Sequence, residues 1–348
     1  MKIEDLVRYF TQGIEVTPES ERTVGMEIET MFVNAWGEPI TLDASQYIFH
    51  CMKNNGWGVE ETKKQKSGDM LITKLRSKDG DMFSYELGRH NLELNVHPII
   101  EKPSVSAYDS KLLKTAIGLL GEIYAIAKHR CAFWSSKDHV LPLFRSTMAW
   151  PEDLLVIPDE RDAAFVQFDG REALNFLAKT ASVQFMYTVK PIEAITALNN
   201  LNKCLNSFLF DGEGFPQEKW WLEYMRCSSA GYRPERYGGP REFRDIEDYC
   251  EKLTIHDVIT PRGLVPFAQV ENLDIPLYIR SIWWHFRLRR FGNNLCVEIR
   301  VLPRLKDEEF PNQMLKVECA MEGRAVGKIP TKREVFGVLL ANSSPNSI

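Results

Sequence analysis

The run from Val24 to Val33 constrains the fold more than any other stretch of this chain. On an extended strand, alternate side chains face opposite sides. Glu27 and Glu29 would therefore stand side by side on one face, and the other face would be apolar, formed by Val24, Met26, Ile28 and Phe32. Adjacent carboxylates repel each other unless a positive charge lies between them, and a divalent cation supplies that charge well. The alternative is a strand whose polar face is simply solvated, as in many antiparallel sheets.

Four more segments show the same period-two alternation, at residues 92–97, 182–187, 284–289 and 295–301. The pattern predicts five strands, each with an apolar face for helices to cover and a polar face. Helices are predicted at 43–54 with Asp43 as the N-cap, at 108–129, from Pro191 to about Phe208, and near 217–227, 244–253, 308–322 and 331–341. The lysine-rich run 63–66 favours a solvated loop. The Gly- and Pro-rich stretch 229–242 favours either a mobile flap or a surface loop.

The polar faces of these five strands carry an unusual set of side chains. Lysine is absent, and the set consists of carboxylates (Glu27, Glu29, Glu93, Glu298), guanidinium groups (Arg287, Arg289, Arg300) and amides (Asn95, Gln184). Magnesium prefers oxygen ligands and commonly bridges carboxylates to nucleotide phosphates, and the arginine fork binds phosphate oxygens bidentately. Glu298 and Arg300 could serve both purposes from one strand. The alternative for this pair is a cross-strand ion pair of little energetic value.

Composition narrows the class of protein. The chain has 348 residues, 44% of them hydrophobic and 26% charged, as expected of a globular protein. Its formal net charge of −5 argues against nucleic-acid binding. The seven cysteines form no Cys-x-x-Cys pair, no apolar run is long enough to cross a bilayer, and the first residues lack a signal-peptide pattern. We therefore expect a cytoplasmic protein with reduced cysteines that binds neither nucleic acid nor membrane.

Four segments, in this order, resemble the glutamate–cysteine ligase family, whose members are carboxylate–amine ligases with a glutamine-synthetase-like fold. They are Gly25-Met26-Glu27-Ile28-Glu29, the stretch from Tyr85 to Leu94, Thr180-Ala181-Ser182-Val183-Gln184, and the stretch from Trp283 to Arg300 that closes on Val297-Glu298-Ile299-Arg300. The likeness spans residues 22–303. The second segment departs from the family pattern at Leu87 and Arg89, and its spacing from Glu86 to Glu93 is one residue longer. The resemblance therefore points to Glu93 as a ligand more strongly than to Glu86.

The resemblance implies an α+β fold in a single domain over residues 1–348. A curved antiparallel sheet would form an open active-site basin, with helices packed on its outer face. ATP would lie in the basin with Mg²⁺ ions, which Mn²⁺ could replace. The implied metal ligands are Glu27, Glu29, Glu86, Glu93 and Glu298. Arg300, with Arg287 or Arg289, would face the γ-phosphate, and Gln184, Ser182 and Trp283 would contribute to ATP binding.

The implied substrate contacts are Asn95, His97, Thr180 and Arg233. His97 has a hydrogen-bonded structural role as its alternative, and Arg233 lies in a loop that either closes over substrate or is a plain surface loop. Trp284 is expected in the core. The oligomeric state is left open.

The implied reaction is ATP-dependent amide formation through an acyl phosphate, between an amino-acid carboxylate and an amine. The glutamate γ-carboxylate and cysteine are the leading pair, which would place the protein in glutathione biosynthesis. One alternative is a phosphotransferase of the guanidino-kinase type. Another is a degenerate member that binds nucleotide or amino acid without turnover. The reaction needs a general base for the incoming ammonium group, and the sequence does not identify it.

Overall fold

The computed structural model of the chain describes residues 3–15, 21–33, 39–65, 68–86, 88–102, 106–131, 134–135, 180–209, 223–228, 236–260 and 263–324. The strands in this part are β1 Arg22–Val33, β2 Gly58–Lys64, β3 Met70–Arg76, β4 Met82–Tyr85, β5 Asn91–Glu101, β6 Trp134–Ser135, β7 Ser182–Thr188, β8 Tyr237–Gly238, β9 Val258–Thr260, β10 Gly263–Val265, β11 Trp283–Trp284, β12 Phe286–Phe291 and β13 Asn294–Pro303. The helices are α1 Ile3–Thr11, α2 Leu42–Asn54, α3 Lys111–Cys131, α6 Pro191–Lys203, α7 Leu205–Leu209, α9 Ile246–Thr254, α10 Ile275–Arg280 and α11 Phe310–Met321, with 3₁₀ turns η1 Ala107–Asp109, η3 Phe267–Gln269 and η4 Asp307–Glu309.

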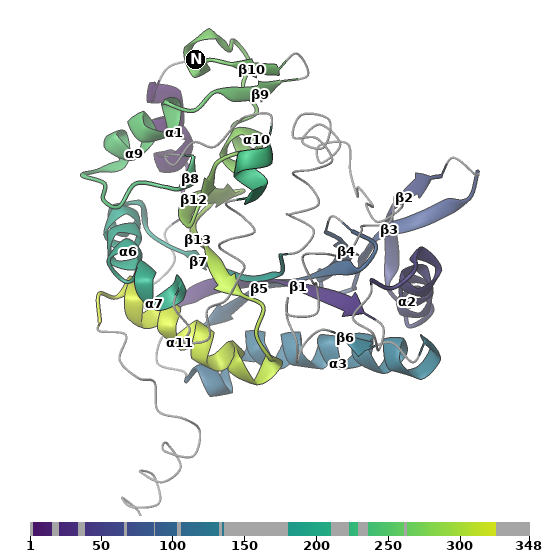
Figure 1. Cartoon of the computed structure of the whole chain (residues 1–348). Helices are drawn as coiled ribbons and strands as arrows, with labels where there is room; N and C mark the ends of the chain where they lie inside the picture. Colours follow the sequence, from purple (N-terminus) through teal and green to yellow (C-terminus); the bar gives the residue numbers. More distant parts are fainter. Residues whose placement is uncertain are drawn as a thin grey trace, which may run out of the picture.

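A large antiparallel sheet forms the centre of the described structure (Figure 1). Its strand order is β12-β13-β7-β1-β5-β4-β3-β2, and β6 pairs with the end of β1. The five predicted alternating segments all lie in it or beside it, and four of them, in β13, β7, β1 and β5, are consecutive neighbours. Two small ribbons accompany the sheet, β9 with β10 and β8 with β11. The large antiparallel sheet expected from the sequence is therefore present.

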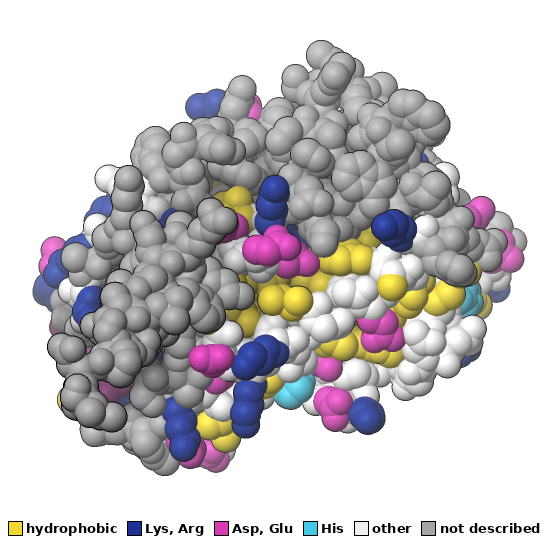
Figure 2. All heavy atoms as spheres, turned by 90° about the horizontal axis from the view of Figure 1, so that it is seen from below, with side chains coloured by type: hydrophobic (Ala, Val, Ile, Leu, Met, Phe, Trp, Pro, Cys, Tyr) yellow, Lys and Arg dark blue, Asp and Glu magenta, His cyan; other side chains and the backbone are white. Residues whose placement is uncertain are grey.

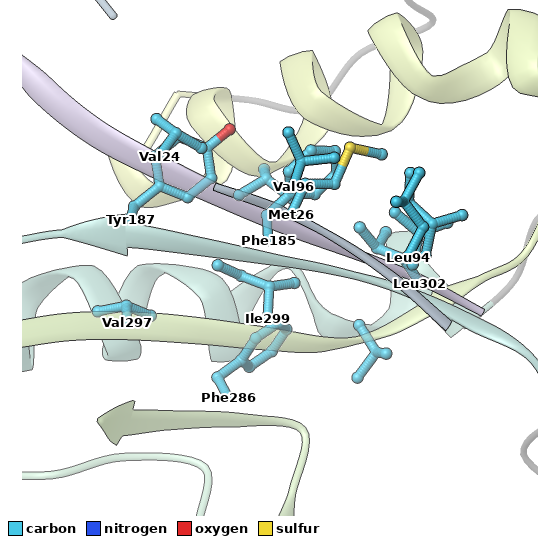
Figure 3. Close-up of a cluster of buried hydrophobic side chains, with 14 of the residues drawn as sticks. Val24, Met26, Leu94, Val96, Phe185, Tyr187, Phe286, Val297, Ile299 and Leu302 are labelled. Atoms are coloured by element: carbon cyan, nitrogen blue, oxygen red, sulfur yellow. The ribbon is translucent and has the colours of Figure 1, made fainter. Parts of the chain in front are cut away.

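One face of this sheet belongs to the hydrophobic core. Figure 3 shows its central side chains, among them Val24, Met26, Phe185 and Ile299, gathered from four neighbouring strands. Helices α3, α6 and α11 contribute side chains to the same cluster, including Leu112, Leu120, Leu198 and Met314. Because apolar residues alternate with polar ones along each strand, burying this face turns the opposite set of side chains to the other side of the sheet.

Several element boundaries differ from the sequence prediction. Thr41, and not Asp43, caps α2, since its hydroxyl oxygen accepts the backbone N–H of Ala44 at 3.2 Å. The helix expected from Pro191 to Phe208 is split at Cys204 into α6 and α7. The segment 284–289 is divided at His285, because the backbone of this residue bonds to Gly238 on one side and to Arg300 on the other.

The expected loop at 63–66 is also partly wrong. Lys63 and Lys64 end β2, an exposed strand at the edge of the described sheet, where its one described partner is β3. Charged side chains are common on such edges because they discourage pairing with another chain. The helix predicted at 331–341 and most of the one at 217–227 fall outside the described residues.

The side of the molecule away from the polar face has a mixed surface. Figure 2 views the structure from the side on which Figure 1 draws α3 and α11, and its coloured acidic and basic side chains are interspersed. Among the described helices, none combines the length and the apolar composition needed to cross a bilayer.

Candidate active site

Strand register brings the polar side chains of the central strands together. Glu29 lies opposite Glu93 across β1 and β5. Glu27 lies opposite Asn95 on one side and opposite Gln184 of β7 on the other. These partners come from segments far apart in the chain, and the amide of Gln184 bonds to Glu29, 155 positions away. The acidic pair of the opening strand is therefore flanked by the polar residues predicted to accompany it.

The acidic cluster consists of Glu29, Glu86 and Glu93. Each offers one carboxylate oxygen, and these oxygens lie within 4.8 Å of one another. Ser182 fixes Glu29 by donating its backbone N–H at 2.9 Å and its hydroxyl at 2.7 Å. Asn95 donates its side-chain amide to Glu93 at 2.5 Å. Carboxylates this close, oriented by neighbouring donors, match the oxygen donor set that Mg²⁺ binds.

Burial dominates the electrostatics around this cluster. It raises the pKa of Glu27 and of Glu29 to about 7, and the pKa of Glu93 to about 8. Repulsion adds to burial, from Glu93 on Glu27 and from Glu86 on Glu93. These carboxyls would ionise fully at neutral pH only with a compensating positive charge nearby, as a bound divalent cation would provide.

Glu298 lies in a different environment. It forms ion pairs with Nε of Arg287 and, at 2.9 Å, with a terminal nitrogen of Arg289. Burial disfavours its charged form, but the charges of Arg287, Arg289 and Arg300 outweigh burial and hold the pKa of Glu298 well below its ordinary value. Burial and the charge of Arg300 lower the pKa of Arg287 to about 9, so this pair remains charged at neutral pH. The prediction of Glu298 as a metal ligand stays a prediction, with two arginines as its immediate partners.

Arg300 is the arginine best placed to receive an anion. Its guanidinium group lies over the ring of Trp283, with 4.8 Å from the central carbon to the ring centroid. Within the described residues, its Nε atom is buried and has no hydrogen-bond partner. A buried N–H donor without an acceptor is costly, and a phosphate or carboxylate oxygen would satisfy it. We define Arg287, Arg289 and Arg300 as the arginine cluster.

The remaining predicted residues take varied positions. Thr180 is buried just before β7, and its carbonyl accepts the side-chain amide of Asn91 at 3.2 Å. His97 contacts the carboxylate of Asp81 at 2.7 Å. Trp284 is 1% exposed, which confirms its expected place in the core. Arg233 lies outside the described residues.

Two site residues were not predicted from the sequence. Arg280, the last residue of α10, is close enough for its positive charge to lower the pKa of both Glu27 and Glu93. Asp81 precedes β4 and holds His97. Neither lies in an alternating segment, so period-two patterning could not find them. An Asp in a turn with Gly80 was the one available signal for Asp81, and it indicates a turn as readily as a site.

The structure thus defines an α+β protein whose large antiparallel sheet carries an acidic cluster and an arginine cluster. No protein-family model matches the chain, and no curated protein matches it. Among solved structures, one similar to this chain is described as "Apo GmaS without ligand", with a TM-score of 0.36 and 8% sequence identity. The match covers 99% of this chain and 61% of that one, so this chain spans about three fifths of its length. A likeness at this level carries no conclusion about function.

Proposed function

We propose that this protein is an ATP- and Mg²⁺-dependent ligase that joins an amino-acid carboxylate to an amine. One observation carries the proposal. Glu29 and Glu93 of the acidic cluster and the three members of the arginine cluster lie on consecutive antiparallel strands of one sheet, with Gln184 of β7 between them, and Glu86 directly follows β4. Carboxylates that hold a metal and arginines that face phosphate are the equipment of phosphoryl transfer. The motif resemblance supports glutamate and cysteine as substrates, an open basin over this face, and a single domain.

The proposed chemistry begins with a carboxylate, which is unreactive toward amines because oxide is a poor leaving group. Its attack on the γ-phosphorus of ATP gives an acyl phosphate and ADP, and the amine then displaces phosphate. Arg300 and Arg289 would neutralise the phosphoryl oxygens while Trp283 keeps the Arg300 guanidinium plane oriented. Glu29, Glu86 and Glu93 would hold Mg²⁺, which supplies charge neutralisation for the phosphates when bound. Catalysis would come mainly from positioning and charge, without a nucleophilic side chain.

The proposal is tested by screening ADP release with ATP, Mg²⁺ and pairs of amino acids, followed by mass spectrometry of the products. A ligase releases ADP only when both an acid and an amine are present, and it yields their condensation product. ADP release with a phosphorylated single acceptor would instead identify a phosphotransferase. No ADP with any pair would favour a protein that binds nucleotide or amino acid without turnover, and would overturn the proposal.

The acidic cluster leads us to expect a changed Mg²⁺ dependence of ATP turnover in the variant Glu93→Gln. The variant removes one ligand charge, so the Mg²⁺ concentration for half-maximal ATP turnover should rise by about tenfold or more. Glu308→Gln, at an exposed glutamate of η4, is the matched control and should leave this concentration unchanged. An Mg²⁺ dependence of the Glu93→Gln variant equal to that of the wild type would remove Glu93 from the metal site.

A further inference from the structure

A histidine–carboxylate pair lies on the strand next to the acidic pair of β1. Asp81, 4% exposed in its side chain, accepts the Nδ1–H of His97 at 2.7 Å and the backbone N–H of the same residue at 3.0 Å. The hydroxyl of Ser77 donates to the other Asp81 oxygen at 2.8 Å. The His97 side chain is 31% exposed. A buried carboxylate thus fixes a histidine that still reaches solvent.

The geometry assigns the protons of this pair. Burial opposes ionisation of Asp81, but hydrogen bonds from His97 and Ser77 outweigh it and lower the pKa of the carboxyl. An ionised carboxylate only accepts hydrogen bonds, so Nδ1 of His97 carries the proton. In the neutral ring Nε2 is then the acceptor, and within the described residues no hydrogen bond occupies it. Serine hydrolases use a carboxylate in this way to orient a histidine that takes protons.

His97 lies further along the strand that carries Glu93 of the proposed reaction site. His97 follows Glu93 and Asn95 along the polar side of β5, about 13 Å from Glu93 at the usual rise of a strand. The neighbouring position on β1 is Gly25, which pairs with Met186 of β7. The pairing of β1 with β5 shifts register at this point, and a Cβ atom at Gly25 would lie 3.9 Å from Cγ of Pro98, the residue after His97.

The other titratable groups of this sheet face are already occupied or unsuited to accept a proton. Metal binding would employ Glu29 and Glu93, Glu27 beside them is a further predicted metal ligand, and Glu298 is held by arginines. Burial raises the pKa of the Cys296 thiol to about 12, so it stays protonated. Histidine is the side chain that most readily takes up and releases a proton near neutral pH.

We propose that His97, oriented by Asp81, is the proton acceptor for the incoming amine. This inference rests on the proposed ligase function. The ammonium group of the amine gives one proton to Nε2 of His97, and its nitrogen lone pair forms the C–N bond to the acyl carbon. The C–O bond to phosphate breaks, and phosphate leaves with the electron pair and takes the second proton from nitrogen. His97 then returns its proton to solvent, which restores the starting state.

Hydroxylamine as the amine distinguishes loss of proton acceptance by His97 from loss of acyl phosphate formation and from misfolding. It is uncharged near neutral pH, so it captures an acyl phosphate as a hydroxamate without a base to deprotonate it. The test compares amide formation from an amino-acid amine with hydroxamate formation, both with ATP and Mg²⁺, in the wild type and two variants. His97→Asn retains a donor near the position of Nδ1, and hence a partner for Asp81, but lacks Nε2. Asp81→Asn replaces a carboxylate that only accepts hydrogen bonds with an amide that can also donate one to Nδ1, so it no longer fixes the tautomer.

The expected result is a fall of about 10²- to 10⁴-fold in amide formation for His97→Asn, with hydroxamate formation close to that of the wild type. Asp81→Asn should show the same split to a smaller degree. The control His50→Asn, at an exposed residue of α2, should leave both rates unchanged. Equal loss of both products in His97→Asn would show a structural role, and retention of both would show no role; either result overturns the inference. A wild type that forms no hydroxamate with any acid would instead contradict the proposed ligase function.

Discussion

At the scale of single residues, neighbours and not residue type decide what a glutamate does on this sheet. Glu298 is buried beside three arginines, which hold its pKa low. Glu93 is partly buried beside Glu86, and desolvation together with that charge raises its pKa to about 8. Both lie in alternating segments, and the family resemblance implied both as metal ligands. The pattern correctly places them on polar faces, but it contains no information on which charge sits opposite.

The buried ion pair of Glu298 gives a residue-scale prediction for Arg287→Met. The variant removes a cation that is 4% exposed and also bonds the carbonyls of Ile279 and Ile282. Arg289 remains paired with the buried Glu298, but the loss of the nearer arginine leaves this charge only partly compensated, and the free energy of unfolding should fall by up to about 3–5 kcal/mol, measured by urea denaturation.

Arg76→Met is the matched control, because its ion pair with Glu60 at 2.5 Å is at the surface. This variant should lower the free energy of unfolding by at most about 1 kcal/mol. Equal costs for the two variants would contradict the view that burial makes the Arg287 pair important to stability.

At the scale of elements, the strand containing the tryptophan pair shows how a local pattern is interrupted. The alternation predicts one strand over 284–289, yet His285 separates β11 from β12 because β11 pairs with β8 instead of with the large sheet. Gly239, next to β8, has a φ of +80° and passes close to the Trp284 ring. The short strands β2, β3 and β4 were missed because charged and polar residues interrupt their alternation.

This close approach predicts the effect of Gly239→Ala. A Cβ atom there would lie 2.6 Å from Cγ of Trp284, so the backbone or the buried ring must shift. Gly56→Ala is the control, because Gly56 has a φ of +99° but nothing within 4 Å of the added atom. The positive φ alone should lower the free energy of unfolding by about 1–2 kcal/mol in either variant. Gly239→Ala should therefore lower the melting temperature clearly more than Gly56→Ala, and equal shifts would show that the ring yields without cost.

At the scale of the whole molecule, the candidate site exists only because distant segments interleave. Strand β7 lies between β1 and β13, and so joins the first hundred residues to the last part of the described chain. This arrangement brings together several desolvated carboxyl groups that repel one another. Their effect should appear in the stability of the entire fold.

The prediction concerns pH. Glu27, Glu29 and Glu93 have folded-state pKa values of about 7, 7 and 8, against an ordinary value of 4.5. Below pH 4.5 both the folded and the unfolded chain hold these protons. As pH rises toward 8, the unfolded chain loses protons that the folded chain retains, so stability falls across this window.

The measurement is thermal unfolding in EDTA and in Mg²⁺ at several values between pH 5 and pH 8. The melting temperature in EDTA should fall with rising pH, and Mg²⁺ should raise it more at pH 8 than at pH 5, because the ion compensates the charges that form. The variant Glu93→Gln should reduce the slope of melting temperature against pH in EDTA. Part of the slope should remain, because burial also raises the pKa of Glu318 in α11 to about 7. A melting temperature in EDTA that rises toward pH 8 would contradict this account.

Which side chains share a strand face can be read from the amino-acid order, because strand periodicity is local and each residue's side follows from its neighbours two positions away. The periodicity predicted Glu27, Glu29, Glu93 and Glu298 on polar strand faces, and the family resemblance implied the large antiparallel sheet. The contacts between these residues follow from the three-dimensional fold. Strand order and register place Glu86 near Glu29, pair Glu298 with the arginines, and bring Asp81 within hydrogen-bond distance of His97. These contacts depend on pairing between distant segments, which local periodicity does not encode.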